Sequence, residues 1–206
     1  MPKSAWLSDA LHQYLLDHSE PVDPVLQELG EETKRRVEGL WIMEIAPEQG
    51  VFMQMLVALS GAKRAVEVGT FTGHSAICIA RGLPDDGKLL CLDTSEEWTA
   101  IARRYWEKAG LTDKIELRLA PAADTLRALP ATEQFDFAFI DADKPNYPVY
   151  YEEILKRMPA GGLVVCANVL WMERQHEFRP AEFRFWVALH ECTHRLQFTG
   201  VPWLRD

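Results

Sequence analysis

Short apolar runs alternate with longer amphipathic segments from residue 63 onward. This alternation is typical of βα units built around a parallel sheet. The pattern predicts strands at residues 65–68, 89–92, 115–119, 135–140, 163–166 and 196–198. Several of these runs are nearly continuous in apolar residues, as expected for strands that helices cover on both faces.

The segments between the predicted strands have helix boundaries that can be read from the sequence. The pattern predicts helices at residues 74–81, 95–109, 147–158 and 181–194. Gly82 and Gly110 follow two of them, as glycines often do at helix ends. Thr94 is predicted to cap the second helix, because Glu97 stands three residues later and completes a capping box.

Residues 1–62 contain no convincing strand. Their apolar spacing predicts helical stretches at residues 9–17, 25–40 and 48–59. A chain of 206 residues favours one domain over two. We therefore interpret 1–206 as a single α/β domain, with 1–62 as a helical cap and 63–206 as the core.

Charge and composition narrow the classes of partner. The chain has 22 Lys and Arg against 31 Asp and Glu, a formal net charge of −9, which disfavours nucleic acid and favours a small-molecule partner. No apolar run approaches the roughly 20 residues that a membrane-spanning helix needs, and the N-terminus lacks the apolar segment of a signal peptide. We expect a cytoplasmic protein whose four cysteines are reduced thiols.

The loop after the first predicted strand has the features of a ligand-binding loop. Gly69 and Gly73 allow the backbone to approach a ligand, and the helix that follows offers free amides to an anionic group. Asp93 ends the second predicted strand, 20 residues after Gly73, where a carboxylate can accept the hydroxyls of a ribose. The alternative is that the two glycines only make a tight turn.

The spacing of this loop differs from that of a dinucleotide site. The glycines stand four apart rather than in a G-x-G-x-x-G pattern, and Glu67 precedes them. Glu67 would repel a pyrophosphate but would suit an ammonium group. A ligand with an amino acid at one end and a ribose at the other fits both carboxylates, which points to S-adenosylmethionine.

Several further motifs occur in order between residues 43 and 171. They are residues 43–50, 67–75, 83–88, 108–111, 140–147 and 161–171. With these segments the sequence resembles the class I S-adenosylmethionine-dependent O-methyltransferases that include catechol and caffeoyl-coenzyme A O-methyltransferases. The resemblance implies a Rossmann-like fold with a mostly parallel sheet, helices on both faces, and a homodimer.

The resemblance also implies a set of cofactor-binding residues. They are Glu67 and Ser75 at the methionine end, Gly69, Thr70 and Gly73 in the loop, Asp93 at the ribose, Ala122 at the adenine, and Asp141 beside the cofactor.

The same resemblance places the chemistry in the segment that begins at Asp141. Asp141 and Asn168 would bind a divalent, Mg²⁺-like ion that lowers the pKa of the acceptor hydroxyl, and Lys144 would take its proton. Met43 and Trp171 are predicted to contact the acceptor. In-line attack on the sulfonium methyl group requires that the enzyme align acceptor and cofactor.

One position departs from the family pattern. Ala167 stands where the family has an aspartate that binds the metal. Because Asp141 and Asn168 are few ligands for Mg²⁺, transfer with a metal and transfer without one both stay open.

Three other functions compete with this interpretation. A cofactor-binding protein without catechol-type transfer would also keep the loop. A methyltransferase for a hydroxylated tRNA base would use the basic residues 34–36, but the acidic net charge opposes it. Residues 190–194 match the zinc motif H-E-x-x-H, but a catalytic zinc needs a third protein ligand. We expect an O-methyltransferase for a small phenolic or catechol-like acceptor.

Overall fold

The computed structural model describes residues 9–18, 23–37 and 39–166. At its centre five parallel strands form one sheet in the order β3-β2-β1-β4-β5. The strands are β1 (Arg64–Val68), β2 (Lys88–Asp93), β3 (Ile115–Leu119), β4 (Phe137–Ile140) and β5 (Leu163–Cys166). The strand order reverses between β1 and β4, and ligands of open α/β sheets bind at the carboxyl ends of strands near such a point.

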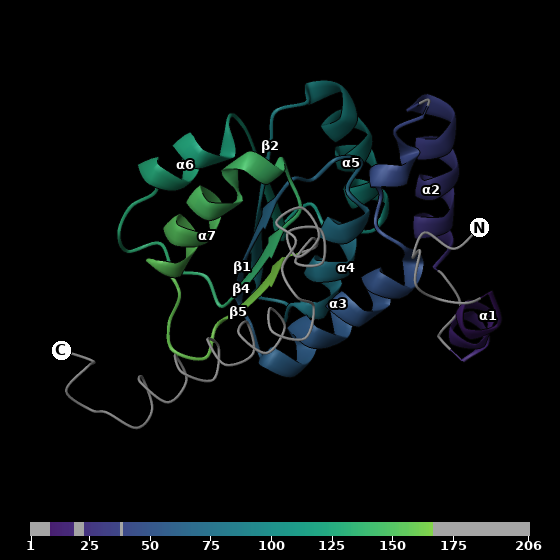
Figure 1. The fold of residues 1–206 in the computed structure, drawn as a ribbon, viewed down its shortest axis with the longest axis horizontal. Coiled ribbons are helices and arrows are strands. Elements are labelled where there is room, and N and C mark those ends of the chain that lie inside the picture. The colour runs from purple at the N-terminus through teal and green to yellow at the C-terminus, as the bar shows by residue number, and fades with distance from the viewer. Residues whose placement is uncertain (1–8, 19–22, 38, 167–206) are drawn as a thin grey trace, which may run out of the picture.

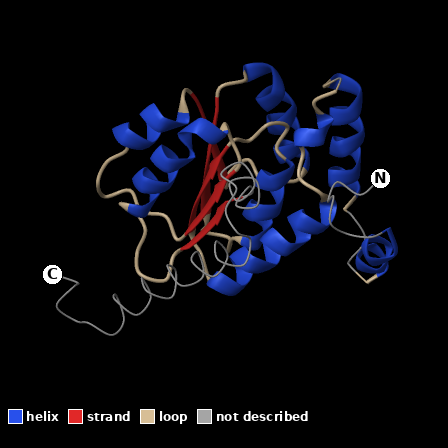
Figure 2. Cartoon of the chain, viewed as in Figure 1, coloured by secondary structure: helices blue, strands red, loops and turns tan. Residues whose placement is uncertain are grey.

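Helices cover both faces of this sheet (Figures 1 and 2). On one face lie α3 (Pro47–Ser60), α4 (His74–Gly82) and α5 (Glu96–Lys108); on the other lie α6 (Ala122–Ala128) and α7 (Tyr147–Leu155). Outside α4 and α5 packs α2 (Pro24–Arg36). The remaining elements are α1 (Asp9–Asp17) and the short 3-10 helices η1 (Trp41–Met43) and η2 (Lys144–Asn146). This arrangement confirms the predicted Rossmann-like α/β class.

The strands alternate their side chains between two cores. Phe137 and Phe139 of β4 pack into the cluster on the side of α3, α4 and α5, while Ala138 and Ile140 pack into the cluster on the side of α6 and α7. All four are fully buried. Burial on both faces explains why the sequence of this strand is continuously apolar.

Several predicted boundaries need correction. The helix predicted at 25–40 ends at Arg36, because the backbone leaves the helical region at Val37, with a φ of −115° and a ψ of 75°. The helix predicted at 147–158 ends at Leu155, and α6 was not predicted. The predicted segments 181–194 and 196–198 lie outside the described residues.

The predicted cap of α5 is wrong by one residue. Ser95, rather than Thr94, is the N-cap, and its hydroxyl accepts a hydrogen bond from the Trp98 amide at 3.2 Å. The reason is that one oxygen of Asp93 accepts hydrogen bonds from the amides of both Thr94 and Ser95. The helix therefore begins one residue later than the capping-box pattern indicates.

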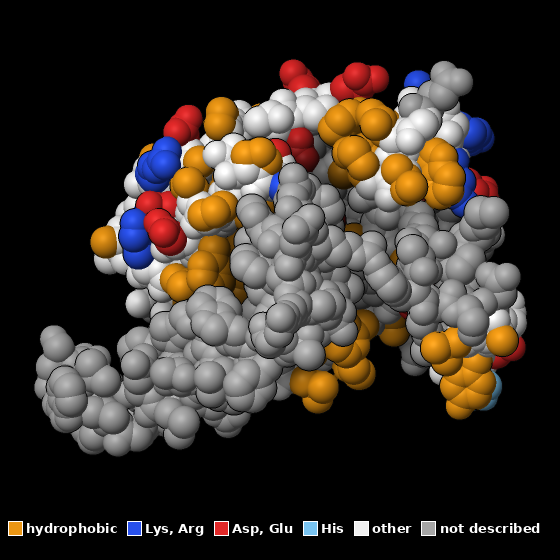
Figure 3. Space-filling view, in the orientation of Figure 1, with side chains coloured by type: hydrophobic (Ala, Val, Ile, Leu, Met, Phe, Trp, Pro, Cys, Tyr) orange, Lys and Arg blue, Asp and Glu red, His pale blue; other side chains and the backbone are white. Residues whose placement is uncertain are grey.

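Charged side chains of both signs are interspersed over α6 and α7 (Figure 3). Asp124 pairs with Arg127 at 3.5 Å, and Glu153 pairs with Lys156 at 2.7 Å. The described surface of α6 and α7 therefore carries charges of both signs, although the chain as a whole is acidic. Among the described residues, no helix is both long enough and apolar enough to cross a membrane.

Candidate active site

A cavity of about 1420 Å³ opens at the carboxyl ends of β1, β2 and β4. Its walls come from the loop after β1, the ends of β2 and β4, the start of α6, and the segment from η1 into α3. Pockets for single small ligands usually measure about 300–1,000 Å³. The space is therefore sufficient for a nucleoside-type cofactor together with a second small molecule.

The two loop glycines are required by packing against the protein itself. A Cβ atom on Gly69 would lie 2.3 Å from the carbonyl oxygen of Asp141, and one on Gly73 would lie 2.7 Å from the Cβ of Ala102. Both glycines also have a φ of 91°, which side chains disfavour. Phe71 between them has a φ of 50°, the single positive value at a non-glycine position in the described residues. The loop is thus tightly constrained on its protein side.

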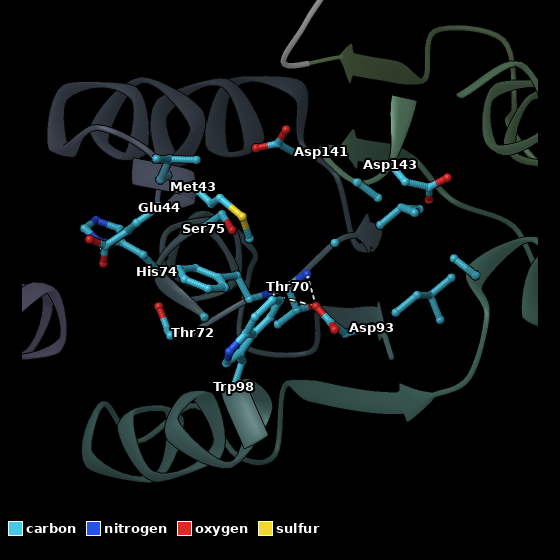
Figure 4. A pocket seen from close by; sticks show the side chains of 18 of the residues that line it. Met43, Glu44, Thr70, Thr72, His74, Ser75, Asp93, Trp98, Asp141 and Asp143 are labelled. Carbon is cyan, nitrogen blue, oxygen red and sulfur yellow. Dashed lines mark hydrogen bonds and ion pairs between the residues drawn. The ribbon is translucent and has the colours of Figure 1, made fainter. Parts of the chain in front are cut away.

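Asp93 holds this loop in place. One carboxylate oxygen accepts hydrogen bonds from the amides of Thr70 and Phe71, both at 2.9 Å (Figure 4). The other accepts from Thr94 at 2.7 Å and Ser95 at 2.8 Å. Asp93 lines the cavity as predicted, but four backbone amides already engage its oxygens, so contact with a ribose stays a prediction.

The first turn of α4 faces the cavity and can bind an anionic group. Gly73 is the N-cap and provides no capping side chain, which leaves the first amides of the helix available to a ligand. Ser75, in this first turn, lines the cavity and is almost fully buried. This arrangement suits the carboxylate at the methionine end of the predicted cofactor.

Glu67 lies beneath the loop rather than on the cavity wall. Its side chain is fully buried, and the thiol of Cys91 donates a hydrogen bond to it at 3.4 Å. Desolvation raises the pKa of Glu67 to about 8, so the carboxyl group is largely neutral at pH 7. Direct contact of Glu67 with an ammonium group stays a prediction, because the residue is absent from the described lining of the cavity.

Two buried contacts tie the N-terminal elements to the loop. The Thr33 hydroxyl of α2 donates to the Thr72 hydroxyl at 2.9 Å, and both residues are fully buried. Nδ1 of His74 lies 3.1 Å from a carboxylate oxygen of Glu44, which follows η1. Sequence reasoning missed both contacts, although Thr33 falls on the buried face of α2 with Leu29.

The segment after β4 brings Asp141 and Lys144 together. Nζ of Lys144 lies 3.3 Å from Asp141 Oδ1, and it also donates to the Ala142 carbonyl at 3.1 Å and to the Tyr147 hydroxyl at 2.9 Å. Burial raises the pKa of Asp141 above its usual range, while Lys144 and the Tyr147 hydroxyl act in the opposite direction. Asp143 points away from Asp141 (Figure 4), and the Tyr150 hydroxyl donates to it.

The other predicted contact residues fall into two groups. Met43, 45% exposed, and Ala122, the first residue of α6, both line the cavity. Ala167, Asn168 and Trp171 lie outside the described residues.

The structure adds Trp98, which lines the cavity and meets the Phe71 ring edge-on at 5.1 Å between centroids. The sequence pattern at the start of α5 did not predict this contact between Trp98 and Phe71.

The described residues do not form a metal site on their own. Nowhere in residues 9–18, 23–37 and 39–166 do three His, Cys, Asp or Glu side chains gather as metal ligands would. Asp141 is the single predicted ligand within these ranges, and it pairs with Lys144.

Comparison with known proteins agrees with this geometry. A family model described as O-methyltransferase matches residues 16–196. Tricin synthase 1 of Oryza sativa subsp. japonica is 36% identical over 208 residues, covering 94% of this chain and 82% of the relative. Caffeoyl-CoA O-methyltransferase 1 of Zea mays is 41% identical over 175 residues, covering 82% and 67%.

Solved structures carry the same fold. An O-methyltransferase from Bacillus cereus, in complex with S-adenosylhomocysteine (SAH), has a TM-score of 0.73 at 38% identity, covering 78% of this chain and 73% of that one. An O-methyltransferase of tomaymycin synthesis from Streptomyces achromogenes, in complex with S-adenosylmethionine, has a TM-score of 0.75 at 28% identity, covering 89% and 83%. The chain therefore belongs to the O-methyltransferase family and is an S-adenosylmethionine-dependent enzyme.

Proposed function

We propose that this enzyme methylates a hydroxyl group of a small phenolic or catechol-like acceptor. The observation that carries the proposal is the position of Lys144, whose side chain is 28% exposed and lies on the wall of the cavity that the cofactor loop also lines. The maize relative is named for caffeoyl-CoA, and a caffeoyl group is a catechol. The wall formed by η1 and α3 carries Met43 and Phe52, whose apolar side chains suit an aromatic ring.

The residues around the loop would hold the cofactor. The amides at the start of α4, together with Ser75, suit the methionine carboxylate, and Glu67 lies beneath this end. Gly69, Thr70 and Gly73 form the loop, Asp93 is assigned to the ribose, and Ala122 to the adenine. When bound, S-adenosylmethionine supplies an electrophilic methyl group on its sulfonium sulfur.

Lys144 would act on the acceptor hydroxyl. An acceptor oxygen forms a bond to the methyl carbon while the carbon–sulfur bond breaks toward sulfur, and the products are a methyl ether and SAH. The proton of the acceptor hydroxyl passes to Nζ of Lys144, which takes it as the neutral amine and becomes the ammonium ion. Asp141, which pairs with this nitrogen, stabilises the positive charge that the proton brings. The protein's own task is to align the two reactants and to hold this lysine beside them.

A binding measurement followed by transfer tests the proposal. Titration calorimetry with SAH is expected to show binding, and catechol added with S-adenosylmethionine is expected to be methylated. Absence of SAH binding would overturn the cofactor assignment, and binding without transfer would overturn the acceptor class. Repeating the transfer with EDTA and with added Mg²⁺ decides whether an ion compensates for Ala167. Equal rates under both conditions mean that Lys144 acts without a metal.

A further inference from the structure

Lys144 is held from one side by the first turn of α7. Its Nζ donates to the Tyr147 hydroxyl at 2.9 Å and lies 4.8 Å from the centroid of the same ring. The other two acceptors, the Asp141 carboxylate and the Ala142 carbonyl, belong to the lysine's own segment. Tyr147 is therefore the acceptor that comes from the following helix.

The Tyr147 hydroxyl is itself fixed. The residue is only 6% exposed, and its hydroxyl donates to the carbonyl of Ile140, the last residue of β4, at 3.2 Å. Whichever nearby oxygen takes the hydroxyl proton, the Tyr147 oxygen keeps a lone pair that can accept a hydrogen bond from Lys144. The lysine is thus connected to the end of a central strand of the sheet.

This connection matters because a lysine side chain is long and flexible. Its four-carbon stem samples many rotamers, and its terminal nitrogen finds water as readily as it finds a protein acceptor. Nζ must nevertheless stand at one place on the cavity wall if it is to meet the acceptor hydroxyl.

We propose that Tyr147 is a positioning residue for methyl transfer: its hydroxyl holds Nζ of Lys144 beside Asp141 on the cavity wall. The proposal rests on the proposed function, in which Lys144 acts on the acceptor. It differs from a packing role, which the ring alone fulfils by its place in the cluster beneath α6 and α7.

The substitution Tyr147→Phe separates the two roles, since it keeps the ring and removes the hydroxyl. We expect kcat for catechol methylation to fall about tenfold, with the KM for S-adenosylmethionine and the affinity for SAH within twofold of the parent. Tyr105→Phe is the matched control: its buried hydroxyl donates to Glu32 at 2.9 Å, on the far side of the sheet. The control is expected to keep the parent kcat.

A measurement on the ligand-free protein, the mobility of the Lys144 side chain, complements the kinetic test. In protein labelled with ¹³C-lysine, the side-chain order parameter of Lys144 is expected to fall in Tyr147→Phe toward that of exposed Lys156, and to stay unchanged in Tyr105→Phe. An unchanged order parameter together with an unchanged kcat overturns the proposal, and so does a parallel loss of kcat and SAH affinity.

The double variant distinguishes this inference from the proposed function. In a Lys144→Ala background, Tyr147→Phe is expected to lower the residual rate no further, because the group that it positions is gone. A tenfold loss in that background would assign the hydroxyl a role independent of Lys144 and overturn the inference. Full activity of Lys144→Ala would instead overturn the proposed role of the lysine, whatever Tyr147→Phe does.

Discussion

A carboxylate oxygen of Asp93 accepts a hydrogen bond from the amide of Thr70 at 2.9 Å, although 23 residues separate the two along the chain. With the equivalent bond to Phe71, it connects the end of β2 to the loop after β1. The loop thus takes its shape from a strand neighbour as well as from its own glycines.

Replacing this carboxylate should therefore loosen the loop. In Asp93→Asn one oxygen becomes an NH₂ group, which cannot accept hydrogen bonds. The pair of backbone amides that faces this group therefore loses its acceptor. We expect at least tenfold weaker SAH binding by calorimetry. Asp124→Asn, at an exposed position on α6, is the control and is expected to bind as the parent does. Parent-like binding by Asp93→Asn would contradict the assigned role.

Two glycines with almost the same φ allow crowding to be measured separately from strain. Gly161 has a φ of 94° and nothing within 4 Å of an added Cβ, whereas Gly69, at 91°, meets the Asp141 carbonyl at 2.3 Å. We expect Gly161→Ala to lower the free energy of unfolding by about 1–2 kcal/mol through strain alone. Gly69→Ala should lower it by about 3 kcal/mol or more, measured by urea denaturation. Equal losses would show that the loop relaxes.

The buried carboxyl of Glu67 should make stability depend on pH. Desolvation raises its pKa from 4.5 to about 8 in the folded protein. Between these values the folded state binds more protons than the unfolded state, so the free energy of unfolding falls as pH rises. Glu67→Gln removes this dependence. We expect the Tm of the parent, relative to this variant, to decline from pH 5 to pH 8 and then to level off; parallel curves would exclude the effect.

Removing Lys144 should slow transfer without weakening cofactor binding. General base catalysis contributes about 10²–10⁴-fold, so the rate of Lys144→Ala on catechol is expected to fall within that range. SAH affinity should stay within twofold, because the first turn of α4 and the loop are unchanged. Lys156→Ala, an exposed lysine on the same side of the sheet, serves as control. Equal loss of rate and affinity would defeat the assignment.

The sequence was sufficient to predict the sheet and the position of the loop. Strands 115–119 and 163–166 are bounded as predicted. The first lies at the edge of the sheet and alternates apolar with charged residues, and the second is a short run of apolar residues. The start of α4 after Gly73 was also predicted, because a glycine between a strand and a helical pattern marks the boundary between them. Local patterns of this kind depend on neighbours in sequence.

The contacts that complete the site depend on neighbours in space, and local patterns do not reveal them. Nothing in residues 93–97 indicates that Asp93 accepts hydrogen bonds from the next two amides, which moves the N-cap to Ser95. Likewise Thr33 looks like an ordinary helix residue until α2 is packed beside Thr72. The burial of Glu67 was equally hidden, because an acidic residue before a glycine loop suggests a ligand contact.

The close approach of Gly69 to the Asp141 carbonyl has a consequence for how the enzyme can change through evolution. The amide of Asp141 also donates to the carbonyl of Val68 at 2.9 Å, so the two segments share both a hydrogen bond and a van der Waals surface. A lineage that altered one segment, to accept a different acceptor for example, would disturb the other. Mutations at these positions should therefore be epistatic, and new acceptor specificity should arise more readily from the η1 and α3 wall.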